Sequence, residues 1–279
     1  MKNDFFFKSL VAVENKPKPP APIVTPLSPT KQLPPSQQSV KQRLNSVLLK
    51  TISDNAGRDR GPMSGTTSGP NSLNAFCDMD NPSVIKALQS IKLVVSVRDC
   101  KAIVDDLVSR PNPVYAVDGE GVNLGPTGPM TLLLLATSEG EVFAFDVMVC
   151  KELVFEGGLQ QLLEDENVVK VMHDCRNDSA ALSWQYGVTM KNVFDTQSAH
   201  AVLQHKLTGR PVYKVKNLGL STLCQLYEAP GNPKKEQLKS LYKRDQRYWA
   251  RRPLTDDMLT YAAFDVIPLV PYIHTKMKK

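Results

Sequence analysis

A short apolar segment that ends in two carboxylates constrains the fold of this chain more than any other feature. Residues 114–117 read Val-Tyr-Ala-Val, a run that favours a buried β-strand, and Asp118, Gly119 and Glu120 follow directly. Side chains two residues apart on a strand point to the same face, so the two carboxylates are expected to project together. Like charges held this close repel each other. The segment is therefore either a polar turn after a strand or part of a site for a divalent cation.

Strand-like and helix-like segments alternate in the later part of the chain. Strands are expected at residues 91–97, 114–117, 131–137, 142–147, 168–172 and 193–194. Helices are expected at residues 99–107, 159–163 and 175–186, and mostly helical pattern follows from residue 196. The turn at 138–141 joins two of the strands into an antiparallel hairpin. The pattern predicts an α/β fold with a mixed sheet, in which the hairpin and parallel strands are flanked by helices.

The first 80 residues have the composition of a disordered tail. Residues 17–35 are dense in proline and residues 57–69 in Gly, Ser and Thr, so they offer too little apolar surface for a core. Residues 39–50 interrupt this composition with apolar side chains at helical spacing. That segment is either a transient helix in a linker or a helix that folds against a protein partner. The expected domains are a tail at 1–80 and a folded domain at 81–279.

Charge is distributed unevenly along the chain. The net charge at pH 7 is +6, yet residues 206–252 carry 12 Lys and Arg against 3 Asp and Glu, a net charge of +9. Such a basic segment in a chain with clustered acids suits a protein that holds a polyanion beside a metal site. The five cysteines show no C-x-x-C pair, which argues against a disulfide framework or a zinc site. No apolar run approaches the roughly 18 residues of a membrane span, so the expected location is the cytoplasm, or the nucleus.

Two further acids lie in settings that need an explanation. Asp178 stands in the first turns of a helix that follows a buried strand and His173, a place that the helix dipole alone favours for an acid. Tyr261 and Asp265 are four residues apart on an apolar helix, and hence neighbours on one face. A carboxylate among so many apolar side chains is costly unless it is neutralised. Each pattern taken alone fits a structural role as well as a functional one.

The three acidic motifs, in their order, resemble the DEDDy class of 3′–5′ exonucleases of the ribonuclease D-like superfamily. They are D-x-E at a strand end, H-x4-D at a strand-to-helix junction and Y-x3-D on a late helix. Segments at 194–197, 216–220 and 249–254 also look like family sequence, and the resemblance covers about residues 90–275. The sequence of residues 117–124 is most similar to that of the Egalitarian-like subgroup.

This resemblance implies a ribonuclease H-like fold and a metal-dependent 3′–5′ exonuclease that removes nucleotides from RNA or single-stranded nucleic acid by two-metal hydrolysis. Asp118, Glu120, Asp178 and Asp265 would hold two divalent cations, Mg²⁺ or Mn²⁺, with Asp118 bridging both. Glu120 and Asp265 would complete the site of the ion that activates water, and Asp178 would hold the other ion. A phenol ordinarily loses its proton only near pH 10, so Tyr261 is expected to orient the attacking water rather than deprotonate it.

The nucleic acid is expected to lie against the basic segment. The candidate contacts are His173, Asn123, Lys214, Lys216, Arg247 and Arg251. Aromatic residues are interleaved with the basic ones, and each either stacks on a base or packs inward beneath a solvated helix face: Tyr213, Tyr242, Tyr248 and Trp249. Three readings of His173 stay open: proton transfer, contact with the substrate, and a structural hydrogen bond. Asp195 is expected to cap the helix that follows it rather than to hold metal.

Two departures from the family pattern bear on activity. Leu134 stands where the family commonly has a glutamine that helps to position the site or the substrate. Only a short segment follows Asp265, with no room for the helical nucleic-acid-binding domain found downstream in ribonuclease D. An RNA-binding adaptor for RNA localisation or a small-RNA pathway, with little or no turnover, is therefore the alternative to an active enzyme. The intact acids disfavour a third reading, a scaffold with a vestigial pocket.

Overall fold

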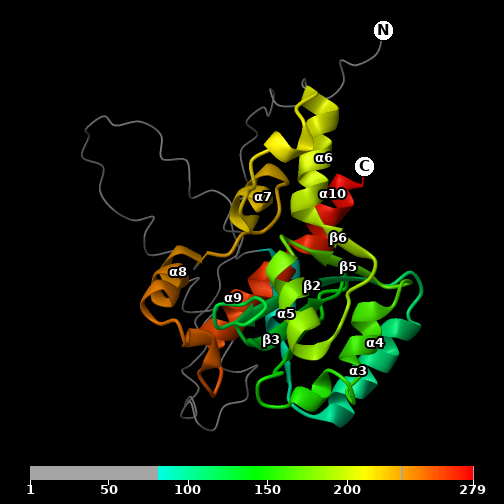
Figure 1. Ribbon diagram of the computed structural model, residues 1–279, viewed down its shortest axis with the longest axis vertical. Coiled ribbons are helices and arrows are strands. Elements are labelled where there is room, and N and C mark those ends of the chain that lie inside the picture. The colour runs from blue at the N-terminus through cyan, green and yellow to red at the C-terminus, as the bar shows by residue number, and fades with distance from the viewer. Residues whose placement is uncertain (1–80, 234, 279) are drawn as a thin grey trace, which may run out of the picture. The chain divides into compact units, whose positions relative to one another are not determined.

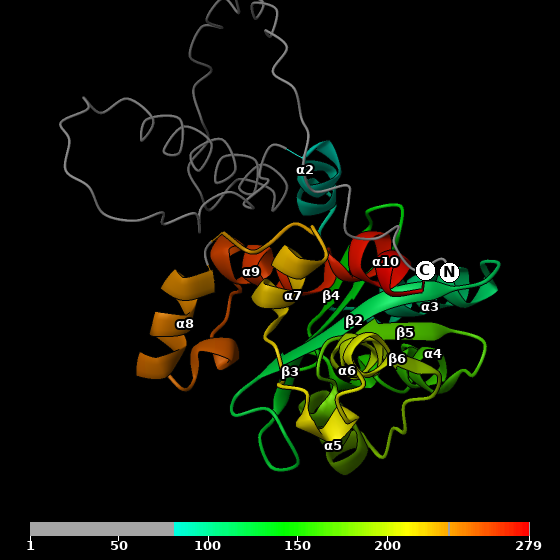
Figure 2. The ribbon, with the colours of Figure 1, turned by 90° about the horizontal axis from the view of Figure 1, so that it is seen from above.

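The computed structural model describes residues 81–233 and 235–278. A six-stranded mixed sheet lies at the centre of these residues (Figures 1 and 2). Its strands are β1 (Lys92–Val94), β2 (Val114–Gly121), β3 (Met130–Ala136), β4 (Val142–Phe145), β5 (Val169–Met172) and β6 (Val193–Asp195). They lie in the order β1-β4-β3-β2-β5-β6, in which β3 runs antiparallel to both neighbours and the other pairs are parallel. The predicted hairpin and mixed α/β sheet are confirmed, whereas the predicted tail and the helix at 39–50 lie outside the described residues.

Helices cover both faces of the sheet and divide the interior into two cores (Figure 2). The first core joins the sheet to α2 (Pro82–Gln89), α7 (Leu220–Leu226), α9 (Asp256–Val266) and the π-helical segment η5 (Leu269–His274). The second core joins it to α3 (Val97–Ser109), α4 (Leu159–Glu164) and α5 (Arg176–Tyr186). The remaining elements are η2 (Lys151–Leu153), α6 (Thr196–Thr208), η3 (Val212–Lys214), α8 (Lys235–Arg244), η4 (Tyr248–Ala250) and α10 (Thr275–Met277).

The alternation of side chains along β2 decides which residues face which core. Ala116 packs in the first core, and its neighbours Tyr115 and Val117 pack in the second. Because alternation continues to the end of the strand, Asp118 and Glu120 lie on the side of Ala116, the side that α9 covers. The strand thus runs on to Gly121 and carries both acids within its paired part.

The structure differs from the sequence pattern in the extent of the first strand and in one additional helix. β1 ends at Val94, since the side chain of Ser96 accepts a hydrogen bond from the Asp99 N–H at 3.1 Å and starts α3 there. The sequence pattern does not predict α2, which begins after the capping residue Asn81. Trp184 is 76% exposed, because α5 buries the face that carries Asp178, Ala181 and Leu182. No helix in the described part of the chain has the length and apolar character needed to span a bilayer.

Candidate active site

Three of the predicted acids meet at the end of β2. Asp118 and Glu120 extend from this strand and Asp265 from α9, and each offers a carboxylate oxygen within 4.8 Å of the other two. α9 can bring its acid there because it is buried along most of its length and contacts both β2 and β3. Thr255 fixes its start, since its side chain accepts a hydrogen bond from the Met258 N–H at 3.2 Å. The strand and the helix, far apart in sequence, together form one acidic cluster.

Asp178 stands beside this group of three rather than within it. It lies in the first turn of α5, where it is 6% exposed. A Cβ built at Gly119 would lie 2.6 Å from its Oδ1 atom, so only glycine at that position lets α5 bring its carboxylate so near the strand. Among the described residues, Oδ1 of Asp178 has no hydrogen-bond partner. A buried carboxylate oxygen in that state is costly, and a bound cation would satisfy it.

Burial raises the pKa of all four carboxyl groups. For Asp118 and Glu120 it raises the pKa well above the ordinary value, and repulsion from neighbouring acids adds to it, first from Asp178 and from Asp118 respectively. Burial also raises the pKa of Asp178 to about 6, although its own N–H and that of Gly119 favour the charged form. The pKa of Asp265 is raised by burial, and Lys235 opposes the rise. Lys235 therefore offsets only part of the negative charge of four carboxylates, and divalent cations would supply the rest.

Lys235, at the start of α8, is the cation beside these acids. Its Nζ lies 3.1 Å from Oδ1 of Asp265, and the two side chains are 25% and 12% exposed. The sequence places Lys235 only in the basic segment and assigns it no role at the acids. No local pattern could have done so, because its partner is 30 residues away and the folding of α8 and α9 brings them together.

A family model described as 3′-5′ exonuclease matches residues 95–279. The chain belongs to the 3′–5′ exonuclease family. The superfamily predicted from the three motifs, with its ribonuclease D-like fold, is thereby confirmed.

Relatives of this exonuclease domain occur among animal proteins and solved nucleases. It is 34% identical to human piRNA biogenesis protein EXD1 over 160 residues, which cover 57% of this chain and 31% of that protein. It is 26% identical to the Egalitarian protein homolog of Caenorhabditis elegans over 221 residues, 77% of this chain and 37% of that protein. The chain thus spans about a third of the length of these relatives. The structure of Trypanosoma brucei RNase D in complex with RNA U12 matches with a TM-score of 0.55 at 28% identity, and the match covers 66% of this chain and 61% of that one.

Tyr261 lies one turn before Asp265 in the exonuclease domain and is buried in the first core. Its ring centroid is 6.1 Å from that of Trp249 in η4. Trp249 and Tyr248 are themselves only 5% and 9% exposed, so of the two readings of these residues the structure matches inward packing. They pack inward because Arg252 anchors the segment, donating from Nε and one Nη to the Asp146 carboxylate at 2.6 and 2.7 Å. Arg252 therefore has a structural role, although the sequence counts it among the basic residues.

His173 is held at both ring nitrogens. Nε2 donates to the Leu218 carbonyl at 3.1 Å, and Nδ1 lies 2.9 Å from the hydroxyl oxygen of Thr196. Burial lowers the pKa of this imidazole. Of its three readings, these contacts match the structural hydrogen bond. The predicted cap at Asp195 is confirmed, since its side chain accepts from the Gln197 N–H at 2.8 Å and starts α6.

The other predicted nucleic-acid contacts are exposed side chains. Lys214 and Lys216 lie in and just after η3, and Lys214 places its Nζ 5.8 Å from the ring centroid of Tyr213, which is 84% exposed. Arg247 and Arg251 flank η4, and Arg251 pairs with Asp245 at 2.7 Å. Asn123 is exposed in the loop after β2, at a positive φ of 49°. These residues remain predicted contacts. They lie on the surface at η3, at η4 and in the loop after β2.

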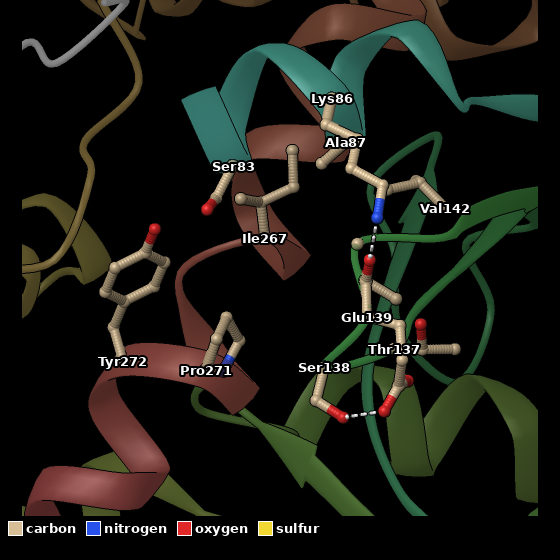
Figure 3. A pocket seen from close by; sticks show the side chains of 12 residues that line it. Ser83, Lys86, Ala87, Thr137, Ser138, Glu139, Val142, Ile267, Pro271 and Tyr272 are labelled. Atoms are coloured by element: carbon tan, nitrogen blue, oxygen red, sulfur yellow. Dashed lines mark hydrogen bonds between the residues drawn. The ribbon is translucent and has the colours of Figure 1, made fainter. Parts of the chain in front are cut away.

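A cavity of about 320 Å³ lies away from the acids, between α2, the turn of the β3–β4 hairpin and η5 (Figure 3). Lys86 closes one side of it by donating from Nζ to the Glu139 carbonyl at 3.1 Å. None of the four predicted acids lines this cavity. It is therefore not part of the acidic cluster.

Proposed function

We propose that this protein is a metal-dependent 3′–5′ exonuclease that removes nucleotides from RNA or another single-stranded nucleic acid. The observation that carries the proposal is the meeting of Asp118, Glu120 and Asp265 at one strand end, with Asp178 beside Gly119, in a chain of this family. RNA is supported as the substrate by the relative from Trypanosoma brucei, whose structure contains RNA.

The donor set suits divalent cations that prefer oxygen ligands, Mg²⁺ or Mn²⁺. Two such ions, when bound, would neutralise the charge that develops on the phosphodiester and make the attacking water more acidic. Asp118 would bind both ions: it offers an oxygen within 4.8 Å of oxygens of Glu120 and Asp265, and the charge of Asp178 also acts on it. Oδ1 of Asp178, which has no hydrogen-bond partner in the described part of the chain, would provide a ligand atom for the second ion.

Tyr261 is proposed to orient the attacking water. It lies one helical turn from Asp265, and the packing of its ring near Trp249 limits the positions that the ring can take. Lys214, Lys216, Arg247 and Arg251 are proposed to bind the phosphates of the strand. Asn123, exposed in the loop after β2, is proposed as a further contact, and His173 is proposed to support the site through its two hydrogen bonds.

An RNA-binding adaptor with little turnover is the second candidate, and Leu134 is the observation that favours it. This leucine is fully buried and lies opposite Asp118, at a position where the resemblance to the family implies a glutamine. The same acids and basic residues would then bind RNA and metal without efficient hydrolysis. A protein partner held by residues 1–80 would fit this candidate, and that segment lies outside the described residues.

Incubation of end-labelled single-stranded RNA with the full chain and Mn²⁺ tests the proposal, with a DNA strand of the same sequence in parallel. We expect the wild type to produce a ladder of products shortened from the 3′ end, and Asp118→Ala and Asp265→Ala to produce none. Asp105→Ala is the matched control, because this acid is exposed on α3 and should leave the ladder intact. Binding of RNA without shortening would support the adaptor, and a ladder from Asp118→Ala would contradict the mechanism.

A further inference from the structure

We infer that Lys235 is a built-in counter-cation of the acidic cluster, which occupies part of the site until a divalent cation displaces it. The inference rests on the proposed metal site and adds a competitor for it within the chain. In the described part of the chain, one basic side chain forms an ion pair with one of the four acids, and that side chain is Lys235.

The position of the ammonium group makes it a competitor. Its Nζ lies 3.1 Å from Oδ1 of Asp265, and Asp265 in turn offers an oxygen within 4.8 Å of Asp118 and Glu120. The positive charge also acts on Asp118 and Glu120, whose charged forms it favours. A carboxylate oxygen paired with an ammonium group at this distance cannot offer the same lone pair to a metal ion.

The attachment of Lys235 allows it to leave. It is the first residue of α8, and its four-carbon side chain can rotate without moving the helix. Leu238 of α8 is buried in the first core, whereas Leu241 and Arg244 further along the helix are exposed. Because the side chain of Lys235 is already 25% exposed, it can move toward solvent while Leu238 keeps α8 attached.

Displacement exchanges one positive charge for two at the acids. Without metal, Lys235 offsets part of the repulsion among the carboxylates, so the cluster can form in the folded chain. With metal, the divalent cation supplies more charge, and the ion pair with Asp265 is broken. The affinity for metal is lowered by the free energy of that ion pair, and the fold is less dependent on metal.

Titration calorimetry with Mn²⁺ and thermal melting of the full chain test this inference. Lys235→Met keeps the length of the side chain without its charge, and we expect it to bind Mn²⁺ roughly tenfold more tightly. In the absence of metal this variant should melt at a lower temperature than the wild type, and Mn²⁺ should raise its melting temperature by more. Lys92→Met is the matched control, because Lys92 is exposed on β1 and should change neither quantity.

A lower melting temperature of Lys235→Met could reflect lost packing as well as the lost ion pair. A second pair of variants measures the contribution of the ion pair alone. In the Asp265→Asn background the carboxylate is absent, so Lys235→Met should lower the metal-free melting temperature by less than it does in the wild type. Equal or weaker Mn²⁺ binding by Lys235→Met, with Mn²⁺ binding by the wild type intact, would overturn this inference and leave the proposed function standing. Failure of both proteins to bind Mn²⁺ would overturn the metal site and the proposed function with it.

Discussion

Leu134 lies directly opposite Asp118 in the antiparallel pairing of β2 and β3. Leu132 pairs with Glu120 in the same way, and both leucines are fully buried. Directly opposed residues point to the same face of a sheet, so each carboxylate stands next to an apolar side chain that offers it no hydrogen bond. This arrangement is one reason why burial dominates the pKa shifts of the two acids.

Substitution of Leu134 by glutamine should therefore cost less stability than the same change on the other face of β3. The amide of Leu134→Gln can donate to Asp118 across the strand pair, whereas the amide of Leu133→Gln enters the second core, which is apolar at that position. We expect the free energy of unfolding of Leu133→Gln, measured in urea, to be roughly 1–3 kcal/mol lower than that of Leu134→Gln. If Leu134 limits turnover, Leu134→Gln also raises the rate of RNA shortening. Equal stability of the two variants would contradict the proposed hydrogen bond to Asp118.

Gly119→Ala should displace Asp178 from the strand end. The added Cβ would meet the Asp178 carboxylate at 2.6 Å and the end of the Met130 side chain at 2.9 Å, so both side chains have to move. We expect weaker Mn²⁺ binding in calorimetry and slower RNA shortening, with an unchanged circular dichroism spectrum. Gly219→Ala is the control, because no atom lies within 4 Å of a Cβ there and its φ is negative. Normal Mn²⁺ binding by Gly119→Ala would show that Asp178 does not need this close approach.

Tyr261→Phe separates the orientation of water from the binding of metal. Phenylalanine keeps the ring that packs near Trp249, so the fold and the affinity for Mn²⁺ should be preserved. Loss of the hydroxyl should slow the hydrolysis of RNA about a hundredfold if it positions the attacking water. Tyr272→Phe is the control: its hydroxyl accepts a hydrogen bond from Asn81 near the separate cavity, and the rate should not change. An unchanged rate with Tyr261→Phe would remove Tyr261 from the mechanism.

The stability of the metal-free protein should depend on pH through Asp178. Because its pKa rises from 3.8 to about 6 on folding, the folded chain binds a proton between these values that the unfolded chain releases. The stabilisation that this proton gives is fully present below about pH 4 and is lost as pH rises past about 6.

Asp178→Asn removes this titration while it keeps the shape of the side chain. We expect it to stabilise the metal-free protein at pH 7.5 by roughly 3 kcal/mol relative to the wild type and to have little effect at pH 4. Urea unfolding in the presence of EDTA at both pH values measures the difference, and the exposed Asp105→Asn should show none. A difference that is the same at both pH values would refute the role of burial.

Binding of RNA should depend on salt through the exposed lysines at η3. Each phosphate of a single strand that a lysine neutralises steepens the slope of log affinity against log salt by about 0.7. The double change Lys214→Gln and Lys216→Gln should therefore make the slope shallower by about 1.4, measured by fluorescence anisotropy with labelled RNA. Lys92→Gln, on the far edge strand of the sheet, should leave the slope unchanged. A slope unaffected by the double change would place the RNA elsewhere on the domain.

Much of this domain is encoded in local pattern. The apolar run before Asp118, the glycine that ends α5 and the cap at Asp195 each act through neighbours in the sequence, so strand, helix end and helix start could be predicted from them. The order of the three acidic motifs was sufficient to predict the family, because each motif is short and keeps its internal spacing. The π-helical segment η5 and the helix α2 have no such local signal.

Other features depend on contacts between segments that are distant in the chain. The ion pair of Lys235 with Asp265, the burial of Trp249 and the pairing of Leu134 with Asp118 each join elements that meet only when the sheet and its helices pack. Packing likewise decides whether a basic or aromatic side chain is exposed. Arg252 and Trp249 are held inside the domain, whereas Arg247 and Tyr213 are exposed.

The sequence alone determined which chemical groups the domain carries and in which order, because strand alternation and helical spacing are properties of neighbouring residues. The tertiary structure decided which of those charged groups lie close enough to affect one another. It set three carboxylates within 4.8 Å of one another, brought Asp178 against Gly119, and placed the ammonium group of Lys235 at Asp265. The reason is physical: the pKa of a carboxylate and its affinity for a cation depend on distance and burial, and both are fixed only when the chain has folded.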